Sequence, residues 1–233
     1  VASRGSYAWG FSGPVAEAGQ TPAAPAIKAP PAALGKALFV GLTRDGKHGL
    51  AKVLCGDDLG DGNAVTEPWF VETSNPVVLS AAATSSAVYF VDGAPGDSGR
   101  ALRCVNSEDG SVLWQRPVAP AASGLLVLNG DNLLVAETAE GLASLDISTA
   151  TAAEVRWQAP IGPCVGMALP IDGLVMVATD GPARWVVLDG LDGTVLMERP
   201  LPSSPTTGPV YAAGRVWVGQ GDGLLGSSLQ GQG

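Results

Sequence analysis

The sequence CVNSEDGSVLWQRPV occupies residues 104–118, and VLDGLDGTVLMERPL occupies residues 187–201. Both read as a strand, a tight turn that ends in glycine, and a second strand. A polar residue, a glycine and a large apolar residue follow one another at intervals of four in both stretches: Asn106, Gly110 and Trp114 in the first, and Asp189, Gly193 and Met197 in the second. A third copy, SLDISTATAAEVRWQAPI, keeps Asp146 and Trp157 around a longer turn.

A second pattern alternates with the first. It consists of a turn, three large apolar residues and a polar turn that contains glycine, and its third apolar residues are Val40, Phe90, Val135, Val177 and Val218. From each tryptophan position to the next apolar triplet the distance is constant: 21 residues from Trp69 to Phe90, 21 from Trp114 to Val135, 20 from Trp157 to Val177 and 21 from Met197 to Val218. This regularity predicts a repeated four-stranded antiparallel sheet.

The predicted strands are apolar along most of their length and do not alternate, which indicates that both faces of each sheet are covered. Small sheets that stack face to face around an axis form an all-β propeller. We expect the tryptophan near the fourth strand of each unit to fill the gap between neighbouring blades, although stacking on a cofactor is an alternative role.

The pattern A/V-L-D-x-x-x-G-x-x-L-W resembles the tryptophan-docking repeat of quinoprotein-like (PQQ-repeat) β-propellers over roughly residues 33–229. Catalytic members of that family bind pyrroloquinoline quinone in an eight-bladed ring with calcium and an aspartate base, and no such constellation can be matched residue by residue here. The resemblance therefore implies the fold, with no cofactor, no metal site and no enzyme activity. Non-catalytic relatives act in envelope assembly, as sensor domains or as accessory subunits, which favours an extracytoplasmic or envelope-associated location.

Counting the units predicts a single domain of five blades. The last blade lacks a fourth strand, and GSYAWGFSG near the N-terminus, with Trp9 at the tryptophan position, supplies one. Residues 5–12 should then pair with the segment around residues 224–229 and close the ring, although a slice of a seven- or eight-bladed ring is the alternative. The expected blades are 33–73, 74–118, 119–161, 162–201, and 202–233 together with 1–12, and an Ala/Pro-rich rim loop occupies 13–32.

Composition sets further bounds on the function. The chain has 233 residues, of which 46% are hydrophobic and 15% charged, and it contains 32 glycines and 18 prolines, as expected for many turns. The net charge of −9 argues against a nucleic-acid partner, and no apolar run is long enough to cross a membrane. Three cysteines cannot all pair, and we interpret Cys55, Cys104 and Cys164 as buried thiols, with one disulfide as the alternative.

Two short motifs suggest chemistry. Residues 96–99 read GDSG, like the nucleophile loop of a serine protease, but the only histidine, His48, falls in the corresponding turn of the preceding blade. We therefore interpret Ser98 as a turn residue. The acidic turn that contains Asp57, Asp58, Asp61 and Asn63 lacks the spacing of a calcium loop and is expected to be solvated.

The predicted function is that of a non-catalytic module that binds or scaffolds another protein, as a monomer or a strand-exchanged oligomer. The alternatives are an enzyme with an axial site, either a quinoprotein remnant or a small five-bladed hydrolase, and a structural subunit that assembles by strand donation. Turns between the second and third strands should lie at the same end as the blade-to-blade connections. They place five cationic or titratable residues on a possible binding face for an acidic partner: Arg44, Lys47, His48, Arg100 and Arg184. The alternative is that these charges are solvated and are offset by Asp45, Asp97, Glu137 and Asp180.

Overall fold

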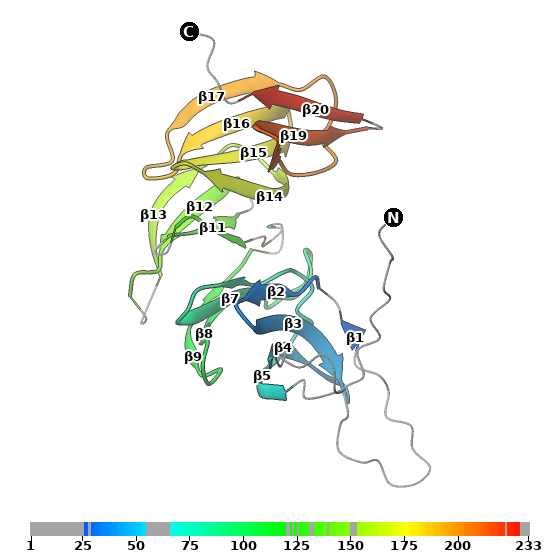
Figure 1. Ribbon diagram of the computed structural model, residues 1–233, viewed down its shortest axis with the longest axis vertical. Helices are drawn as coiled ribbons and strands as arrows, with labels where there is room; N and C mark the ends of the chain where they lie inside the picture. The colour runs from blue at the N-terminus through cyan, green and yellow to red at the C-terminus, as the bar shows by residue number, and fades with distance from the viewer. Residues whose placement is uncertain are drawn as a thin grey trace.

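The computed structural model describes residues 26–27, 29–54, 66–119, 122, 124, 126–130, 133–138, 140–149, 153–221 and 223–228. Within these residues every regular element is a β-strand, and the strands form five antiparallel sheets. Figure 1 shows the sheets following one another in chain order along an arc, with the first sheet at one end and the last at the other. The prediction of an all-β fold built from four-stranded antiparallel blades is confirmed.

The first sheet has an inner strand that is interrupted. Both β1 and β2 pair with β3, β1 at Leu42 and Thr43 and β2 at residues 37–39, and Pro30 and Pro31 separate them. Proline lacks the N–H that a strand needs to continue its ladder. The strands are β1 (Ala26–Ile27), β2 (Ala32–Leu34), β3 (Ala37–Arg44), β4 (Lys47–Leu54) and β5 (Thr66–Thr73).

This inner strand corrects one expectation. The Ala/Pro-rich segment 13–32 was expected to be a rim loop, but its last part contains β1 and the first residue of β2. Alanine and proline at an edge are compatible with short strands, so composition alone did not separate loop from strand here. Residues 13–25 lie outside the described residues.

The three middle sheets each have four strands, and in each sheet consecutive strands are neighbours. The second sheet contains β6 (Ala82–Ala83), β7 (Ala87–Asp92), β8 (Ala101–Asn106) and β9 (Val112–Pro117). The third contains β10 (Leu126–Leu128), β11 (Leu133–Glu137), β12 (Leu142–Asp146) and β13 (Glu154–Ala159). The fourth contains β14 (Cys164–Ile171), β15 (Leu174–Asp180), β16 (Ala183–Asp189) and β17 (Val195–Pro200).

The last sheet has three strands among the described residues: β18 (Val210–Ala212), β19 (Arg215–Gln220) and β20 (Gly223–Ser228). The expected fourth strand, residues 5–12 with Trp9, lies outside the described residues. Five sheets agree with the predicted number of blades. Closure of the ring by the N-terminal segment stays a prediction, since the first and last sheets lie at opposite ends of the arc (Figure 1).

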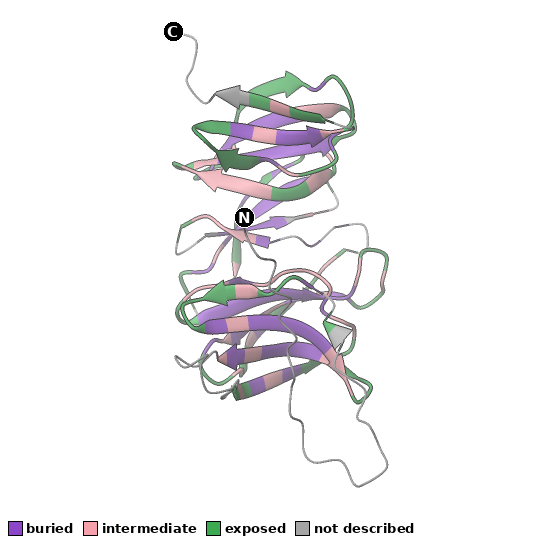
Figure 2. Cartoon of the chain, turned by 45° about the vertical axis from the view of Figure 1, so that its right-hand side comes forward, coloured by how far each residue is buried: buried purple, intermediate pink, exposed green. Residues whose placement is uncertain are grey.

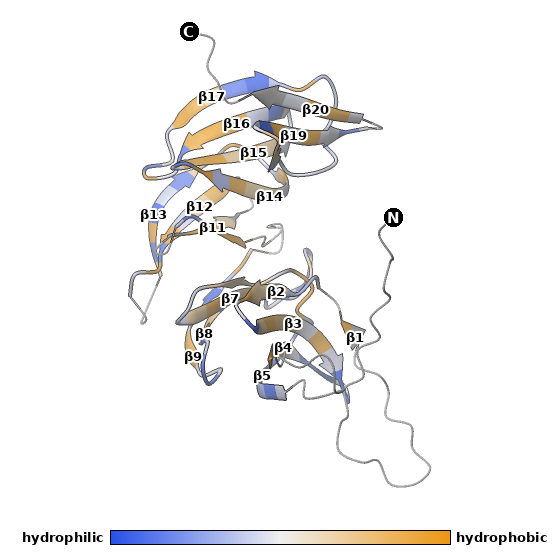
Figure 3. Cartoon of the chain, viewed as in Figure 1, coloured by the Kyte–Doolittle hydropathy of each residue, from blue (hydrophilic) through white to orange (hydrophobic). Residues whose placement is uncertain are grey.

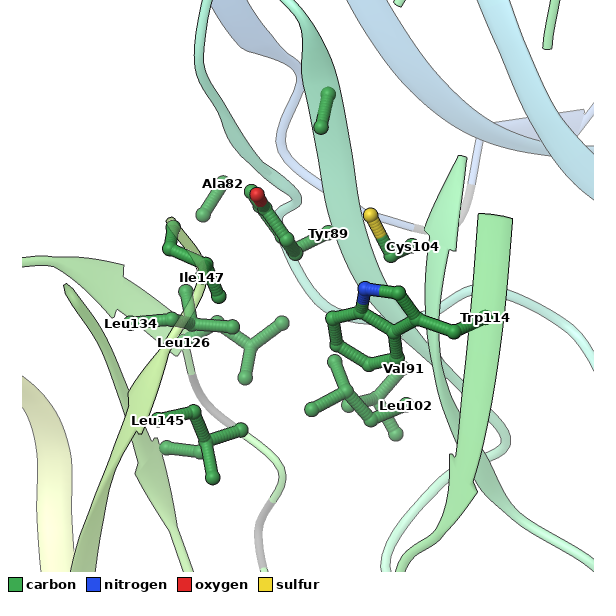
Figure 4. Close-up of a cluster of buried hydrophobic side chains, with 12 residues drawn as sticks. Ala82, Tyr89, Val91, Leu102, Cys104, Trp114, Leu126, Leu134, Leu145 and Ile147 are labelled. Atoms are coloured by element: carbon green, nitrogen blue, oxygen red, sulfur yellow. The ribbon is translucent and has the colours of Figure 1, made fainter. Parts of the chain in front are cut away.

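The core lies between successive sheets. Figure 2 shows that the central strands of the sheets are mostly buried, and Figure 3 that they are mostly hydrophobic. In the close-up of Figure 4, Tyr89, Leu102 and Trp114 of the second sheet face Leu134 and Leu145 of the third. Similar clusters join the first sheet to the second, the third to the fourth and the fourth to the fifth. Because the central sheets pack on both faces, their strands are apolar throughout, as the sequence predicted.

The strand-four tryptophans join neighbouring sheets in a specific way. The indole N–H of Trp69 donates to the carbonyl of Ser107 at 3.2 Å, and that of Trp157 to the carbonyl of Gly190 at 3.1 Å. In both cases the carbonyl belongs to the turn between the third and fourth strands of the following sheet. Trp69, Trp114 and Trp157 are all buried, at 7%, 9% and 6% exposure. Packing between blades is therefore the role of these residues.

A glycine in the turn between the third and fourth strands leaves room for the tryptophan ring of the preceding sheet. A Cβ on Gly110 would lie 2.9 Å from the Trp69 ring, and one on Gly193 would lie 2.7 Å from the Trp157 ring. Both glycines also have positive φ, at +75° and +76°. The Asx…Gly part of each repeat thus forms the turn against which the tryptophan of the preceding blade packs.

Met197 departs from this arrangement. It pairs with Val187 beside a bulge, as Trp114 pairs with Cys104, so the predicted alignment of the repeats agrees with the register. However, Met197 is 40% exposed, and the expectation that it is buried like the tryptophans is wrong.

Candidate protein-binding surface

One end of the molecule holds both the turns between second and third strands and the connections between sheets, as predicted. Backbone hydrogen bonds tie the two sets of loops together. The N–H of Gly93 donates to Pro76 at 2.8 Å, the N–H of Gly162 to Glu140 at 2.8 Å, and the N–H of Thr206 to Gly219 at 2.8 Å. We call this the connection end.

The predicted cationic residues of the first sheet lie at the connection end, but their charges are already paired. Arg44 forms an ion pair with Glu67 at 2.7 Å and lies 4.6 Å over the ring of Phe70. Lys47 forms an ion pair with Glu72 at 2.8 Å, with both side chains more than half exposed. These pairs leave little cationic charge for an acidic partner.

The remaining members of that set are similarly engaged. His48 shares a 2.7 Å hydrogen bond between its Nδ1 and the Thr43 hydroxyl. Arg184 forms an ion pair with Glu198 at 2.9 Å and donates to the carbonyl of Ile161 at 2.9 Å. The structure therefore favours the alternative in which these charges are offset, although the partners are strand residues and not the turn acids that the sequence suggested.

Arg100 requires a correction. It is only 2% exposed, and its guanidinium donates to the carbonyls of Gly93, Ala119 and Ala122. Burial lowers its pKa from the usual value, with Asp97 and Asp92 opposing the shift, but an arginine at neutral pH stays charged. Arg100 holds a turn and a connection together and cannot belong to a docking face.

A second buried charge was not predicted. Asp92 is fully buried and forms an ion pair with Arg103 at 2.9 Å, while also accepting from the N–H of Ala101 at 2.6 Å. Removing one partner would leave an unpaired buried charge. A single acidic residue at the end of an apolar strand was the only sequence signal for this contact.

The GDSG motif forms a turn, as expected. Gly93, Gly96 and Gly99 have positive φ, the Asp97 carboxylate accepts from the N–H of Ala94 at 2.7 Å, and the Ser98 carbonyl accepts from Asn75 at 3.3 Å. A serine nucleophile needs a base, and His48 lies on a different sheet, engaged with Thr43.

Within the described residues, His, Cys, Asp and Glu form no group of three that could hold a metal ion. Cys104 is a buried free thiol, and burial raises its pKa to about 12. Cys164 is half-buried, and its thiol contacts the carbonyl of Gly162 at 3.8 Å. Cys55 and the acidic turn at Asp57, Asp58, Asp61 and Asn63 lie outside the described residues. No helix of the described part is long and apolar enough to cross a membrane.

The opposite end, which carries the turns between strands three and four, has a different character. A hollow of about 390 Å³ lies there between the third and fourth sheets. It is lined by four apolar side chains, by glycine backbone and by two polar side chains: Leu128, Pro170, Ile171, Leu191, Gly130, Gly173, Gly190, Asn129 and Asp172. Leu191 stands at the hollow with 64% of its surface exposed.

Local hydrogen bonds fix this hollow. Asn129 donates to the carbonyl of Gly190 at 3.4 Å, and Arg156 donates to the carbonyl of Leu191 at 3.2 Å. The N–H of Gly190 donates to the carbonyl of Gly173 at 2.8 Å. The backbone carbonyls of Gly190 and Leu191 are therefore both engaged by side chains of the third sheet and its turns. A second hollow, of about 490 Å³ at the connection end, is lined by the polar side chains of Thr138, Glu140 and Gln158 beside leucine, alanine and proline.

The fold is that of a β-propeller. No family model matches the sequence, and a search of curated proteins finds no match. Solved structures do match. BamB from Moraxella catarrhalis is 15% identical with a TM-score of 0.53, over 88% of this chain and 72% of that one. The computationally designed Ika8 protein is 16% identical with a TM-score of 0.55, over 89% and 72%.

A third structure is a β-propeller by its own description. The Cps50 (Swd1) β-propeller domain of Myceliophteria thermophila is 10% identical to this chain with a TM-score of 0.52, over 84% of this chain and 67% of that one. At such identities these likenesses show the fold alone. The propeller class is therefore established, whereas the PQQ-repeat resemblance remains an interpretation of the sequence.

Proposed function

We propose that this chain is a non-catalytic, quinoprotein-like propeller that binds another protein, as a scaffold or an accessory subunit of a larger assembly. The observation that carries the proposal is the apolar hollow between the third and fourth sheets, with Leu191 exposed beside it. An exposed leucine costs solvation free energy that contact with a partner's apolar side chain would recover.

The geometry favours a protein partner over a small substrate. The hollow has apolar walls with one amide and one carboxylate, Asn129 and Asp172, and neither is part of a nucleophile–base pair. Interfaces commonly place a few apolar anchors in such hollows and surround them with polar residues. The neighbouring propellers, BamB and the Swd1 domain, support a rigid ring as the scaffold but do not identify the partner.

The test begins with the partner. Chemical cross-linking in the native source, followed by mass spectrometry, identifies proteins joined to this chain, and the binding of the purified partner is then measured by calorimetry. Leu191→Asp should weaken binding at least tenfold, or about 1.4 kcal/mol. Leu34→Asp, at an exposed leucine of the first sheet, is the matched control and should change binding less than twofold. Equal affinity of Leu191→Asp and the unchanged protein would refute a binding role for this surface.

A further inference from the structure

The hollow beside Leu191 has a carboxylate in its wall. Asp172 is the only ionisable side chain among the described residues that line this hollow. It lies in the turn between β14 and β15, is exposed, and has a φ of +49°. Within the described part of the chain, its carboxylate forms neither an ion pair nor a hydrogen bond. An apolar hollow therefore adjoins one carboxylate that is available to a partner.

The strand ends around the hollow carry mostly negative charge. At this end of the third and fourth sheets, the described residues include a single cation, Arg156. It forms an ion pair with Asp146 at 3.9 Å and donates to the carbonyl of Leu191 at 3.2 Å, so it is already engaged. The same turns and strand ends carry four carboxylates besides that of Asp172: Asp146, Glu154, Asp189 and Asp192.

Two of these carboxylates are kept ionised by hydrogen bonds within their own turns. The backbone N–H and then the hydroxyl of Thr194 lower the pKa of Asp192, and the hydroxyl and then the N–H of Ser148 lower the pKa of Asp146. Both side chains therefore stay charged well below neutral pH. Their charge attracts a cationic group that approaches the hollow and repels an acidic one.

We propose that the hollow beside Leu191 binds a protein segment in which an apolar side chain stands next to a lysine or an arginine. The apolar side chain enters the hollow, and the cation lies against Asp172. Contact with the apolar wall supplies most of the affinity, and the carboxylates select the partner and speed its approach. This inference rests on the proposed function, because it names the partner chemistry of the same surface.

A library of short random peptides displayed on phage provides the probe. The library is selected against the full chain and counter-selected against Leu191→Asn, which removes the exposed leucine without changing the charge. The enriched peptides should carry a lysine or an arginine beside a large apolar residue. The most enriched peptide is then synthesised with a fluorescent label, and its Kd is measured by anisotropy.

Two Asp-Gly turns provide matched variants. Asp45 is exposed and is followed by glycine, as Asp172 is, and its φ is +48°, but it lies at the connection end between β3 and β4. Asparagine adopts this left-handed conformation readily, so both Asp→Asn variants should keep the urea midpoint of the unchanged protein. At about 50 mM salt, Asp172→Asn should weaken binding about threefold and Asp45→Asn less than about 1.5-fold, and the difference should vanish at about 1 M salt.

The outcomes separate this inference from the proposed function. Peptides that depend on Leu191 but lack lysine and arginine would overturn the inference and leave the proposed function standing. Equal effects of Asp172→Asn and Asp45→Asn would do the same. If no enriched peptide depends on Leu191, the proposed function fails at this surface, and the inference fails with it.

Discussion

Two of the buried strand-four tryptophans of this propeller combine apolar packing with one directional bond. Trp69 and Trp157 bury large rings against the following sheet while their indole N–H groups donate to turn carbonyls. A buried indole without an acceptor would lose part of what its burial contributes. The bond therefore fixes which turn each ring meets, and it sets the spacing between blades.

Tyr89 and Cys104 lie opposite each other on β7 and β8, and burial raises the pKa of both to about 12. Their ordinary values are 10.0 and 9.0. Because the folded-state values are raised, the stability that these groups contribute is complete below about pH 9 and is lost as the pH rises toward about 12. Urea unfolding at a series of pH values should show a free energy that falls above pH 9.

Tyr89→Phe removes one of the two groups and keeps the ring. Above pH 9, its free energy of unfolding should fall less steeply with pH than that of the unchanged protein. Near neutrality the free energy of unfolding should change little with pH in both proteins. Parallel curves for the two proteins would mean that Tyr89 titrates normally in the folded state.

The tryptophans, Ser98 and Arg100 show what can be predicted at the residue scale. The recurring position of Trp114 and Trp157 identified them as inter-blade residues, and the turn chemistry around Ser98 predicted the turn that the structure shows. Arg100 was misplaced on the surface because its acceptors at Gly93, Ala119 and Ala122 come from two separate loops. No local pattern in the sequence brings those carbonyls together.

At the scale of elements, the repeat spacing predicted the strand pairs and turns, since alternating apolar triplets and Asx…Gly turns have strong local signals. The start of the inner strand, β1, fell within the segment predicted to be a loop, because Pro30 and Pro31 separate it from β2. The hollow beside Leu191 was also missed, since it forms between turns of two different sheets. The only signal in the sequence was Leu191 in the turn at 189–193. The turn at 106–110 has Glu108 at the corresponding position.

Two turn glycines provide a matched test of the tryptophan contact. Gly46 and Gly110 both have φ of +75°, but nothing lies within 4 Å of a Cβ on Gly46, whereas one on Gly110 would meet the Trp69 ring at 2.9 Å. Gly46→Ala should cost about 1–2 kcal/mol of unfolding free energy for the left-handed backbone alone. Gly110→Ala should cost a further 1–3 kcal/mol or so for overpacking.

Urea denaturation of both variants gives the comparison. A larger loss for Gly110→Ala isolates the contact with Trp69, because the backbone term is shared by the two sites. If the two alanine variants lose the same free energy of unfolding, the Trp69 ring does not pack on the turn at Gly110. The contact between the first two sheets is then not as described.

At the scale of the whole molecule, stability depends on apolar packing between successive sheets. Four apolar clusters each span two neighbouring sheets, so each inner sheet is held from both sides. Such an arrangement resembles a repeat array, in which interfaces between units contribute much of the stability. The fourth sheet shares a cluster with the last, while Met197 and its neighbours on β17 stay exposed.

The propeller class was predictable because the repeat recurs along the whole chain. The course of the arc was not, because curvature depends on small rotations between sheets that no residue pattern encodes. Closure of the ring by residues 5–12 stays a prediction, because that segment lies outside the described residues. The repeat pattern does not identify the binding partner, because binding depends on surface residues and not on the residues that define the repeat.

Strand-four tryptophans hold the blades of this propeller together, and Trp157 offers a test with a matched control on its own strand. Trp157→Ala should lower the free energy of unfolding by about 3–5 kcal/mol, because it removes a buried ring between the third and fourth sheets. Val155→Ala, at an exposed position of the same strand, should lower it by less than about 1 kcal/mol. Losses of similar size in the two variants, measured by urea denaturation, would contradict the account.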